Sequence, residues 1–367
     1  MTDSGIEKIL RKAVNLEFIS HDEGLLLYNK ASLSDLMYYS SLVRQIIHPE
    51  KIVTYIVDRN INLTNICCSK CLFCNFCRAK NDNDAYILTI DDYRKKIDEL
   101  FNVGGNQILL QGGMNPDLDI FYYENLFKEL KYIYPTLKLH ALGPPEVVFI
   151  AKKSKISCKE TLIRLRNAGL DSLPGAGAEI LSDRVRKIVS PAKCSSEEWL
   201  NVMRTAHKLG ITTSSTMMFG HLETIEERID HIIKIRDLQS QKPQNTKGFI
   251  SFTLWPLAGK NTRLIKKFSE IKQITAHEYL RMLSISRLLL INVQNIQVSW
   301  LTMGEDIAQL CLNAGANDMS SIMIEENVVS QAGKNYKMGS TEMEQLILKA
   351  GFKPIRRNQE YKTLKEL

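Results

Sequence analysis

The sequence predicts an α/β fold in which eight βα units form a (βα)8 TIM-barrel-like barrel. From Tyr55 onward, short β-rich runs alternate with amphipathic helical segments of about 12 to 18 residues, the pattern of repeated βα units on a parallel sheet. The chain has 367 residues, and such barrels commonly exceed roughly 250 residues as one unit. Its hydrophobic share of 44% and charged share of 24% allow a sizeable buried core. No long linker or repeat interrupts the pattern, so we expect a single barrel with terminal extensions.

Eight short runs between the helical segments are the candidate strands of this barrel. They are INLTNI from Ile61, QILLQ from Gln107, LKLHAL from Leu137, SLPGAG from Ser172, TTSSTMMFG from Thr212, FISFTLW from Phe249, NIQVSW from Asn295 and a weaker stretch near Asp318.

The helices between these strands carry recognisable start signals. Thr89 is predicted to cap TIDDYRKKIDELFN, which has acidic residues in its first turn. Ser195 or Ser196 is the expected cap of EEWLNVMRTAHK, and Thr224 caps IEERIDHIIKIRDLQ with Glu227 at the capping-box position. Each segment is therefore a good crossover helix.

The two ends of the chain lie outside the βα pattern. Residues 1–52 are predicted to form a helical lead-in with Ser34 as one N-cap, and the barrel is expected over residues 53–325. Residues 326–367 are expected to form an extension that packs on the barrel, in which the helix TEMEQLILKAG precedes KPIRRNQEY.

Charge and hydropathy narrow the classes of function. The net charge of +7 arises from 48 Lys and Arg against 41 Asp and Glu, and the basic residues are dispersed. The longest basic cluster, KKSK at 152–155, favours a solvated loop over a nucleic-acid patch, and an anionic small substrate would suit the mild positive charge. No apolar run approaches the ~20 residues of a membrane span, and the first residues lack a signal-peptide pattern. We therefore expect a cytoplasmic protein whose thiols stay reduced.

Five of the chain's 8 cysteines gather in NICCSKCLFCNFCRAK, and in a reduced compartment this points to metal or redox chemistry. Cys68, Cys71, Cys74 and Cys77 form consecutive CxxC pairs, but zinc folds usually separate two such pairs by a dozen or more residues. A ferredoxin run has C-x2-C-x2-C-x3-C and a remote ligand beside a proline, and neither feature is present. The remaining parse takes Cys67, Cys71 and Cys74 as C-x3-C-x2-C.

The C-x3-C-x2-C parse resembles the signature of the radical S-adenosylmethionine enzymes, and it follows the first barrel strand, as it does in that family. The resemblance implies a radical S-adenosylmethionine fold in which Cys67, Cys71 and Cys74 hold three irons of a 4Fe-4S cluster. It leaves the fourth iron for S-adenosylmethionine. Phe73 is expected to cover the cluster, while Cys68 and Cys77 are expected to be bystanders. Soft thiolates do select iron-sulfur clusters.

A closer resemblance covers nearly the whole chain, from about Val53 to Tyr361. The blocks that carry it are YIVDRNINLTNIC, QGGMNPDL, SLPGAGAEIL, WLNVMRTAHKLG, TMMFGHLET, NIQVSW and GANDMSSIMIEENV. Together they are similar to the cyclic dehypoxanthine futalosine synthases, the radical cyclases of the futalosine route to menaquinone. Aminofutalosine synthase and the radical subunits that build the F420 chromophore are related alternatives, and a structural zinc-binding or nucleic-acid-binding protein is the non-enzyme alternative.

The resemblance also implies a reaction and its partners. A 5'-deoxyadenosyl radical would remove hydrogen from the ribose C4' of dehypoxanthine futalosine, and the sugar radical would add to the benzoate ring. The substrate is a small molecule, the electron donor would be a protein such as flavodoxin or ferredoxin, and neither nucleic acid nor a membrane span is expected.

Several residues are predicted to form the cofactor site. The resemblance implies that Gln111, Gly112 and Gly113 pair backbone groups with the methionyl amine of S-adenosylmethionine. It also suggests that Glu179 binds the ribose hydroxyls of this cofactor, although an acid favoured by a helix N-terminus is an equal alternative.

Substrate contacts are expected at the carboxyl ends of the strands, where barrel enzymes place their sites. The catalytic candidates by position are His140, His221, Ser299 and Glu325, and Trp255 fits as a further contact. Arg184 or Arg204 are candidates to pair with a substrate carboxylate.

Overall fold

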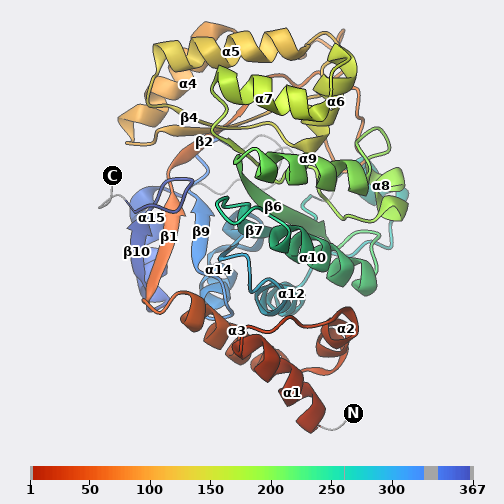
Figure 1. Ribbon diagram of the computed structural model, residues 1–367, viewed down its shortest axis with the longest axis vertical. Coiled ribbons are helices and arrows are strands. Elements are labelled where there is room, and N and C mark those ends of the chain that lie inside the picture. The colour runs from red at the N-terminus through yellow and green to blue at the C-terminus, as the bar shows by residue number, and fades with distance from the viewer. Residues whose placement is uncertain (1–2, 260, 326–337, 364–367) are drawn as a thin grey trace.

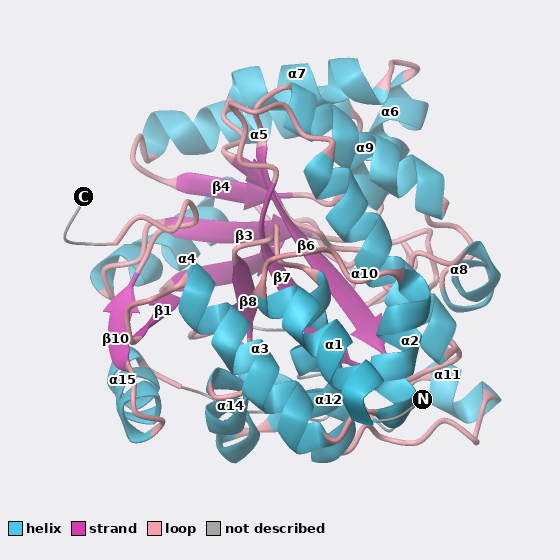
Figure 2. Ribbon diagram, turned by 60° about the horizontal axis from the view of Figure 1, so that its bottom comes forward, coloured by secondary structure: helices cyan, strands magenta, loops and turns pink. Residues whose placement is uncertain are grey.

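The computed structural model describes residues 3–259, 261–325 and 338–363, and these form a curled parallel sheet with helices round its outside (Figures 1 and 2). The sheet has ten strands in the order β10-β1-β9-β8-β7-β6-β5-β4-β3-β2, and every paired neighbour is parallel. The predicted α/β barrel is therefore confirmed.

The strands are β1 (Ile52–Ile56), β2 (Asp58–Asn62), β3 (Gln107–Gln111), β4 (Lys138–Ala141), β5 (Ser172–Leu173), β6 (Thr212–Phe219), β7 (Phe249–Pro256), β8 (Asn295–Gln297), β9 (Asp318–Ser321) and β10 (Lys353–Arg356). Each of the eight candidate strands has a counterpart among β2 to β9. The first begins at Asp58 rather than Ile61, because the chain pairs with β3 from Asp58 onward.

Two strands, β1 and β10, were not predicted. Only Val57 separates β1 from β2, yet β1 pairs with β9 and β10 while β2 pairs with β3. One continuous extended segment thus joins the two sides of the curled sheet, whereas the sequence predicted a single strand that begins only at Ile61. The Pro354 of β10 argues against a strand in sequence, but proline is tolerated at a sheet edge, where β10 lies.

The helices follow the predicted βα alternation. They are α1 (Asp3–Val14), α2 (His21–Lys30), α3 (Leu33–Ile47), α4 (Ile90–Asn102), α5 (Ile120–Ile133), α6 (Pro144–Ser154), α7 (Cys158–Ala168), α8 (Asp183–Val189), α9 (Ser196–Lys208), α10 (Ile225–Ser240), α11 (Arg263–Lys267), α12 (Ala276–Leu289), α13 (Trp300–Met303), α14 (Glu305–Leu312) and α15 (Ser340–Lys349). None of the helices in the described ranges is long and apolar enough to cross a membrane.

Side-chain capping explains where the crossover helices begin. Thr89, Ser195 and Thr224 each accept a hydrogen bond from the backbone N–H three residues later, and each completes a capping box. The lead-in helix α3 begins two residues earlier than expected, because Ser32 and not Ser34 caps it and accepts a hydrogen bond from the Asp35 N–H.

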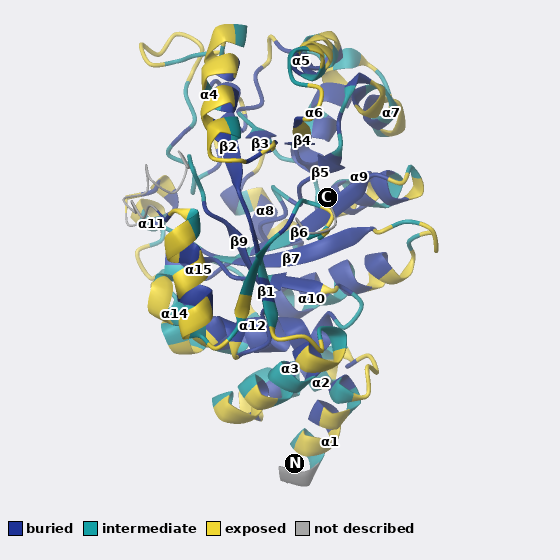
Figure 3. Cartoon of the chain, turned by 90° about the vertical axis from the view of Figure 1, so that its left-hand side faces the viewer, coloured by how far each residue is buried: buried dark blue, intermediate teal, exposed yellow. Residues whose placement is uncertain are grey.

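The sheet is more deeply buried than the helices that surround it. The strands are almost wholly buried, while the outer faces of the helices are exposed (Figure 3). Helices α1 to α3 lie together at one end of the molecule, where α3 packs on α12 and α2 packs on α10 (Figure 1).

Candidate active site

The loop after β2 carries the cysteine cluster and encloses a cavity of about 180 Å³. Cys67, Cys71, Cys74 and Cys77 line this cavity, whereas Cys68 is exposed and does not. We call this space the cluster cavity. The predicted ligands therefore face one another across a single space, and Cys77 is the one bystander that shares it.

Hydrogen-bond donors surround the predicted ligand sulfurs. The backbone N–H groups of Met114 and Ser69 lie 3.3 and 3.4 Å from Cys67 Sγ, and Ser69 Oγ lies 3.0 Å from Cys71 Sγ. Such donors favour the thiolate form that binds iron. Burial raises the pKa of the Cys71 thiol, so iron binding would have to displace its proton.

Cys77 has a different environment from the three predicted ligands. Its Sγ donates a hydrogen bond to the Cys67 carbonyl oxygen at 3.1 Å, and burial raises its pKa to about 11. The thiol already has a protein partner that stabilises its protonated form.

The glycines after β3 let this strand approach the cluster loop. A Cβ on Gly113 would lie 2.1 Å from the Ile66 carbonyl oxygen and 2.9 Å from Cys67 Cβ. The Gly113 N–H donates to the Thr64 carbonyl oxygen at 2.8 Å, which ties the two segments together. Glycine is therefore required here by the backbone contact itself.

Glu146 of α6 forms a hydrogen bond with the backbone that follows β3 at the cluster cavity. Its Oε1 accepts a hydrogen bond from the Gly112 N–H at 3.2 Å. The carboxyl group is buried against the cavity, and burial raises its pKa to about 7.

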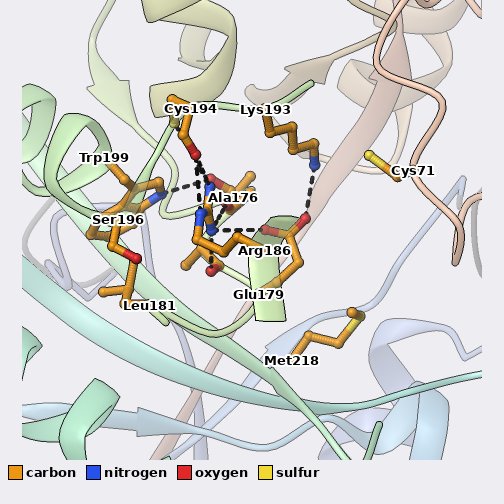
Figure 4. A network of polar contacts seen from close by, with 12 residues as sticks. Cys71, Ala176, Glu179, Leu181, Arg186, Lys193, Cys194, Ser196, Trp199 and Met218 are labelled. Carbon is orange, nitrogen blue, oxygen red and sulfur yellow. Dashed lines mark hydrogen bonds and ion pairs between the residues drawn. The ribbon is translucent and has the colours of Figure 1, made fainter. Parts of the chain in front are cut away.

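A buried charged network lies beside the cluster loop, as Figure 4 shows. Glu179 Oε1 accepts from Lys193 Nζ at 2.8 Å, while Arg186 Nη1 lies 3.6 Å from Oε2. Burial alone would raise the pKa of Glu179, but the charges of Lys193 and Arg186 outweigh it and lower the pKa. The carboxylate is thus held in its charged form.

One oxygen of this carboxylate is left over. Glu179 Oε2 is buried and has no hydrogen-bond partner among the described residues. Glu179 also has a φ of +38°, a region that non-glycine residues rarely adopt, so its placement is held by its surroundings. A buried acceptor that has an ion-pair contact but no hydrogen bond, at the wall of a cavity, is a ready site for a ligand hydroxyl.

A second and larger cavity of about 360 Å³ fills the interior of the barrel. Asn62, Phe73, Gln111, Ala176 and Gly177 line both this cavity and the cluster cavity. We call the larger space the barrel cavity. The two spaces therefore adjoin at the carboxyl ends of β2 and β3.

Alternate residues of the strands face the barrel cavity, as the period of two of a strand requires. The polar ones include Asp58, Asn60, Asn62, Ser214, Thr216, Ser251, Thr253 and Gln297. Hydroxyl and amide groups of this kind suit a ligand rich in hydroxyl groups.

The predicted catalytic candidates are not brought together. His140 and Trp255 line the barrel cavity, but His221, Ser299 and Glu325 line neither cavity. His221 Nε2 lies 3.0 Å from the Met218 carbonyl oxygen in the protein interior, and Ser299 Oγ lies 2.6 Å from Thr302 Oγ1. Glu325 forms ion pairs with two cations on the outer side of β2, namely Arg59 at 2.8 Å and Lys96 at 2.7 Å.

Sequence reasoning missed several polar groups of the two cavities. Asp58 and Asn60 were missed because the predicted first strand began at Ile61, and Asn62 was not singled out within it, although the alternation in VDRNIN was a readable signal. Glu146 and Lys193 were missed because each reaches the cluster cavity from a segment with no motif of its own.

Two family models match the chain. Residues 61–235 match the radical SAM superfamily, and residues 246–367 match the CofH/MqnC C-terminal region.

Curated relatives match almost the entire chain. It is 40% identical to a cyclic dehypoxanthine futalosine synthase of Halalkalibacterium halodurans over 98% of this chain and 95% of that one. It is 42% identical to a cyclic dehypoxanthine futalosine synthase of Streptomyces coelicolor over 98% of this chain and 89% of that one. It is also 39% identical, over 85% of this chain and 80% of that one, to a Methanosarcina mazei 5-amino-6-(D-ribitylamino)uracil--L-tyrosine 4-hydroxyphenyl transferase.

Solved structures share the fold at low sequence identity. Methylornithine synthase matches with a TM-score of 0.70 and 19% identity over 95% of this chain and 97% of that one. The hydrogenase maturase HydG matches with a TM-score of 0.75 and 16% identity over 97% of this chain and 77% of that one.

Proposed function

The chain belongs to the radical S-adenosylmethionine superfamily and, within it, to the CofH/MqnC family, and from this premise we propose that it is a cyclic dehypoxanthine futalosine synthase. The observation that carries the proposal is the identity of 40% and 42% to two such synthases over 98% of the chain. The site described above supports it, because it combines a thiol-lined cavity with an adjoining polar cavity of suitable size.

Cys67, Cys71 and Cys74 would hold the 4Fe-4S cluster. Their sulfurs face one cavity, Cys67 Sγ accepts from two backbone N–H groups and Cys71 Sγ lies against the Ser69 hydroxyl, which fits thiolate ligation. When bound, the cluster and S-adenosylmethionine supply a reducing electron and a 5'-deoxyadenosyl radical that removes hydrogen from the substrate.

The remaining residues of the cluster cavity would bind and orient S-adenosylmethionine. Lys193 of this cavity presents an ammonium group for the methionyl carboxylate, and Oε2 of Glu179, which lines the adjoining barrel cavity and has no hydrogen bond, presents an acceptor for a ribose hydroxyl. The Gln111 carbonyl already accepts from the Leu63 N–H at 2.9 Å, so the carbonyl groups of Gly112 and Gly113, just after β3, would bind the methionyl amine. Phe73 lies between the two cavities and would separate the cluster from the substrate.

The barrel cavity would hold dehypoxanthine futalosine. Removal of the C4' hydrogen leaves a sugar radical that adds to the benzoate ring, and transfer of one proton to a base and of one electron to a one-electron acceptor, such as an oxidised iron-sulfur centre, would then restore the ring and complete the spirocycle. The strand residues would bind the ribose hydroxyls, and the enclosing barrel would exclude water from the radical intermediates. We expect the reducing electron to come from a flavodoxin or ferredoxin.

The comparisons support the alternative functions to different degrees. The named transferases of the related family match at 35 to 39% identity, and five of the six match over 85 to 86% of the chain. This likeness keeps an F420-chromophore activity as the second candidate, alongside aminofutalosine synthase. The structural zinc-binding and nucleic-acid-binding alternatives are wrong as a class, because the chain is a radical S-adenosylmethionine enzyme.

The test is anaerobic reconstitution of the cluster followed by incubation with S-adenosylmethionine, dithionite and dehypoxanthine futalosine. Cyclic dehypoxanthine futalosine should form together with 5'-deoxyadenosine. Formation of 5'-deoxyadenosine without cyclised product would overturn the substrate assignment, and L-tyrosine with 5-amino-6-(D-ribitylamino)uracil in a parallel assay tests the second candidate.

A further inference from the structure

The chain after β10 folds across the amino end of the barrel. We call residues 357–363 the C-terminal plug. Its side chains reach the beginnings or inner faces of several strands: Gln359 bonds Gln107 of β3 at 3.0 Å and approaches His140 of β4 at 3.3 Å, and Tyr361 accepts from Gln297 of β8 at 3.0 Å. The plug therefore closes the end of the barrel that lies away from the cysteine loop.

Arg357 is the fixed centre of this plug. Its Nε and Nη2 bond the two carboxylate oxygens of Asp318 at 2.5 and 2.8 Å, and its guanidinium lies 4.0 Å from the centre of the Tyr361 ring. Thr54 also donates to Asp318 at 2.5 Å. Bidentate pairing and stacking hold the plane of a guanidinium in one orientation.

Arg357 also faces the barrel cavity. Among the described residues that line this cavity it is the one cation, and Asp58 and Glu179 are the acids. Glu179 lies at the opposite end, beside Lys193. Burial raises the pKa of Asp58, which favours its neutral form next to the plug. Arg357, although paired with Asp318, is thus the cation that an anionic group in the barrel cavity can contact.

The guanidinium retains hydrogen-bonding capacity. An arginine has five N–H donors, and the bonds to Asp318 and to the Asn358 carbonyl oxygen use Nε, one N–H of Nη2 and one N–H of Nη1. One N–H group remains on each terminal nitrogen. Two such N–H groups can bind the two oxygens of one carboxylate.

We propose that Arg357 is a carboxylate-binding residue at the floor of the barrel cavity and that it holds the benzoate end of the substrate. This inference rests on the proposed function and adds the direction in which the substrate lies. The strand β2 runs from Asp58 at the floor to Asn62 at the cluster cavity, a depth of about 13 Å at ~3.3 Å per residue. An elongated molecule with its carboxylate on Arg357 places its ribose toward the cluster.

The two arginines suggested from the sequence do not serve this role. Arg184 of α8 is exposed and pairs with Glu227 at 2.6 Å, and Arg204 of α9 lies on the outer helical layer beside Glu197. Neither lines a cavity, whereas Arg357 comes from a segment that the sequence placed in a packing extension.

The experiment compares acid and amide forms of one ligand. Dissociation constants of dehypoxanthine futalosine and its benzamide analogue are measured by calorimetry on the reconstituted full-length protein. The wild type should bind the acid about 100-fold more tightly than the amide, because a buried charge-assisted pair is lost with the amide. In the Asp318→Asn/Arg357→Gln double variant, which leaves no unpaired buried charge, the preference should fall below about threefold. The matched control is Glu124→Gln/Arg164→Gln, an ion pair between α5 and α7 that lines neither cavity.

Each outcome of this experiment either supports or overturns the assignment of Arg357. Retention of the acid preference in the double variant, or equal binding of acid and amide by the wild type, overturns the assignment of Arg357. If the wild type binds neither form, the proposed substrate is wrong, and the comparison is repeated with L-tyrosine and L-tyrosinamide. A preference for tyrosine that the double variant loses then supports the carboxylate site, and the absence of any preference overturns it.

Discussion

The two ends of the barrel present different kinds of chemical groups. At the carboxyl ends of the strands, thiols, glycines and backbone N–H groups surround the cluster cavity, and Cys67, Cys71 and Cys74 come from one short loop. At the amino ends, Asp318 and Arg357 come from two separate segments and form a closed network with Tyr361. The first end suits a metal cluster, and the second suits the recognition of a charged organic group.

This difference indicates that the radical chemistry and the recognition of the substrate's charged group are separated along the barrel axis. The cluster end must leave sulfur atoms and one glutamate oxygen free for ligands, so it keeps unsatisfied groups. The floor presents a charge that is already oriented, so its groups are almost fully bonded before substrate arrives. Damage to one end should therefore affect cofactor properties, and damage to the other should affect substrate affinity.

The largest expected effect is at the cluster ligands. Replacement of Cys67, Cys71 or Cys74 by alanine should remove the cluster and lower turnover by at least about a thousandfold, since the radical chemistry belongs to the cofactor. Iron per chain and the iron-sulfur absorbance measure the loss. Cys68→Ser and Cys77→Ser are the matched controls and should keep iron near the wild-type level. A loss of iron in either control would show that the three ligands are chosen wrongly.

The next effect concerns the contact between β3 and the cluster loop. Gly113→Ala places a Cβ against the Ile66 carbonyl oxygen, and we expect it to lower the free energy of unfolding by about 3 kcal/mol and to reduce cluster loading. Denaturant titration of the cluster-free protein measures the stability. Gly210→Ala is the control, because its Cβ meets nothing within 4 Å and only its φ of +72° is unfavourable, at about 1 kcal/mol. Equal losses in the two variants would contradict the steric account.

A smaller effect is expected at the charged network of the cluster end. Lys193→Gln should raise the dissociation constant of S-adenosylmethionine roughly 10- to 100-fold, because it removes the ammonium that would pair with the methionyl carboxylate. Equilibrium binding to the reconstituted protein measures it, with Lys152→Gln on the surface as control. Unchanged affinity for S-adenosylmethionine would show that Lys193 does not bind this cofactor. A change in the affinity for substrate alone would contradict the separation of the two ends.

The smallest effect is a dependence of stability on pH. Burial lowers the pKa of His140 and His231 to about 3 and that of His207 to about 4. The folded state therefore disfavours their protonation, and each should cost about 1.4 kcal/mol of unfolding free energy per pH unit as the pH falls below ~6.5. Denaturant titrations at pH 7 and 5 measure this slope. Burial also lowers the pKa of His48 to about 4, so four histidines contribute to this slope. His140→Gln, at the barrel cavity, should remove about a quarter of their contribution, and an unchanged slope would contradict the burial of a neutral His140.

The sequence predicted the cluster end far better than the floor. Closely spaced cysteines and the glycines after QILLQ are local patterns, and the structure places both at one cavity. The floor depends on pairs such as Asp318 with Arg357 and His140 with Gln359, which are 39 and 219 positions apart. No periodicity or spacing relates such residues, because only the closing of the barrel brings them together. His221, Ser299 and Glu325 were chosen by their position after strands, but sequence neighbours hold the first two outside the cavities, and the distant Arg59 and Lys96 hold Glu325.

The account as a whole requires the ribose of the substrate to face the cluster end. Dehypoxanthine futalosine carrying deuterium at C4' tests this most directly, with mass spectrometry of the 5'-deoxyadenosine formed in a single turnover. We predict that one deuterium appears in 5'-deoxyadenosine in proportion to the cyclised product. Formation of cyclised product with deuterium-free 5'-deoxyadenosine would contradict the account.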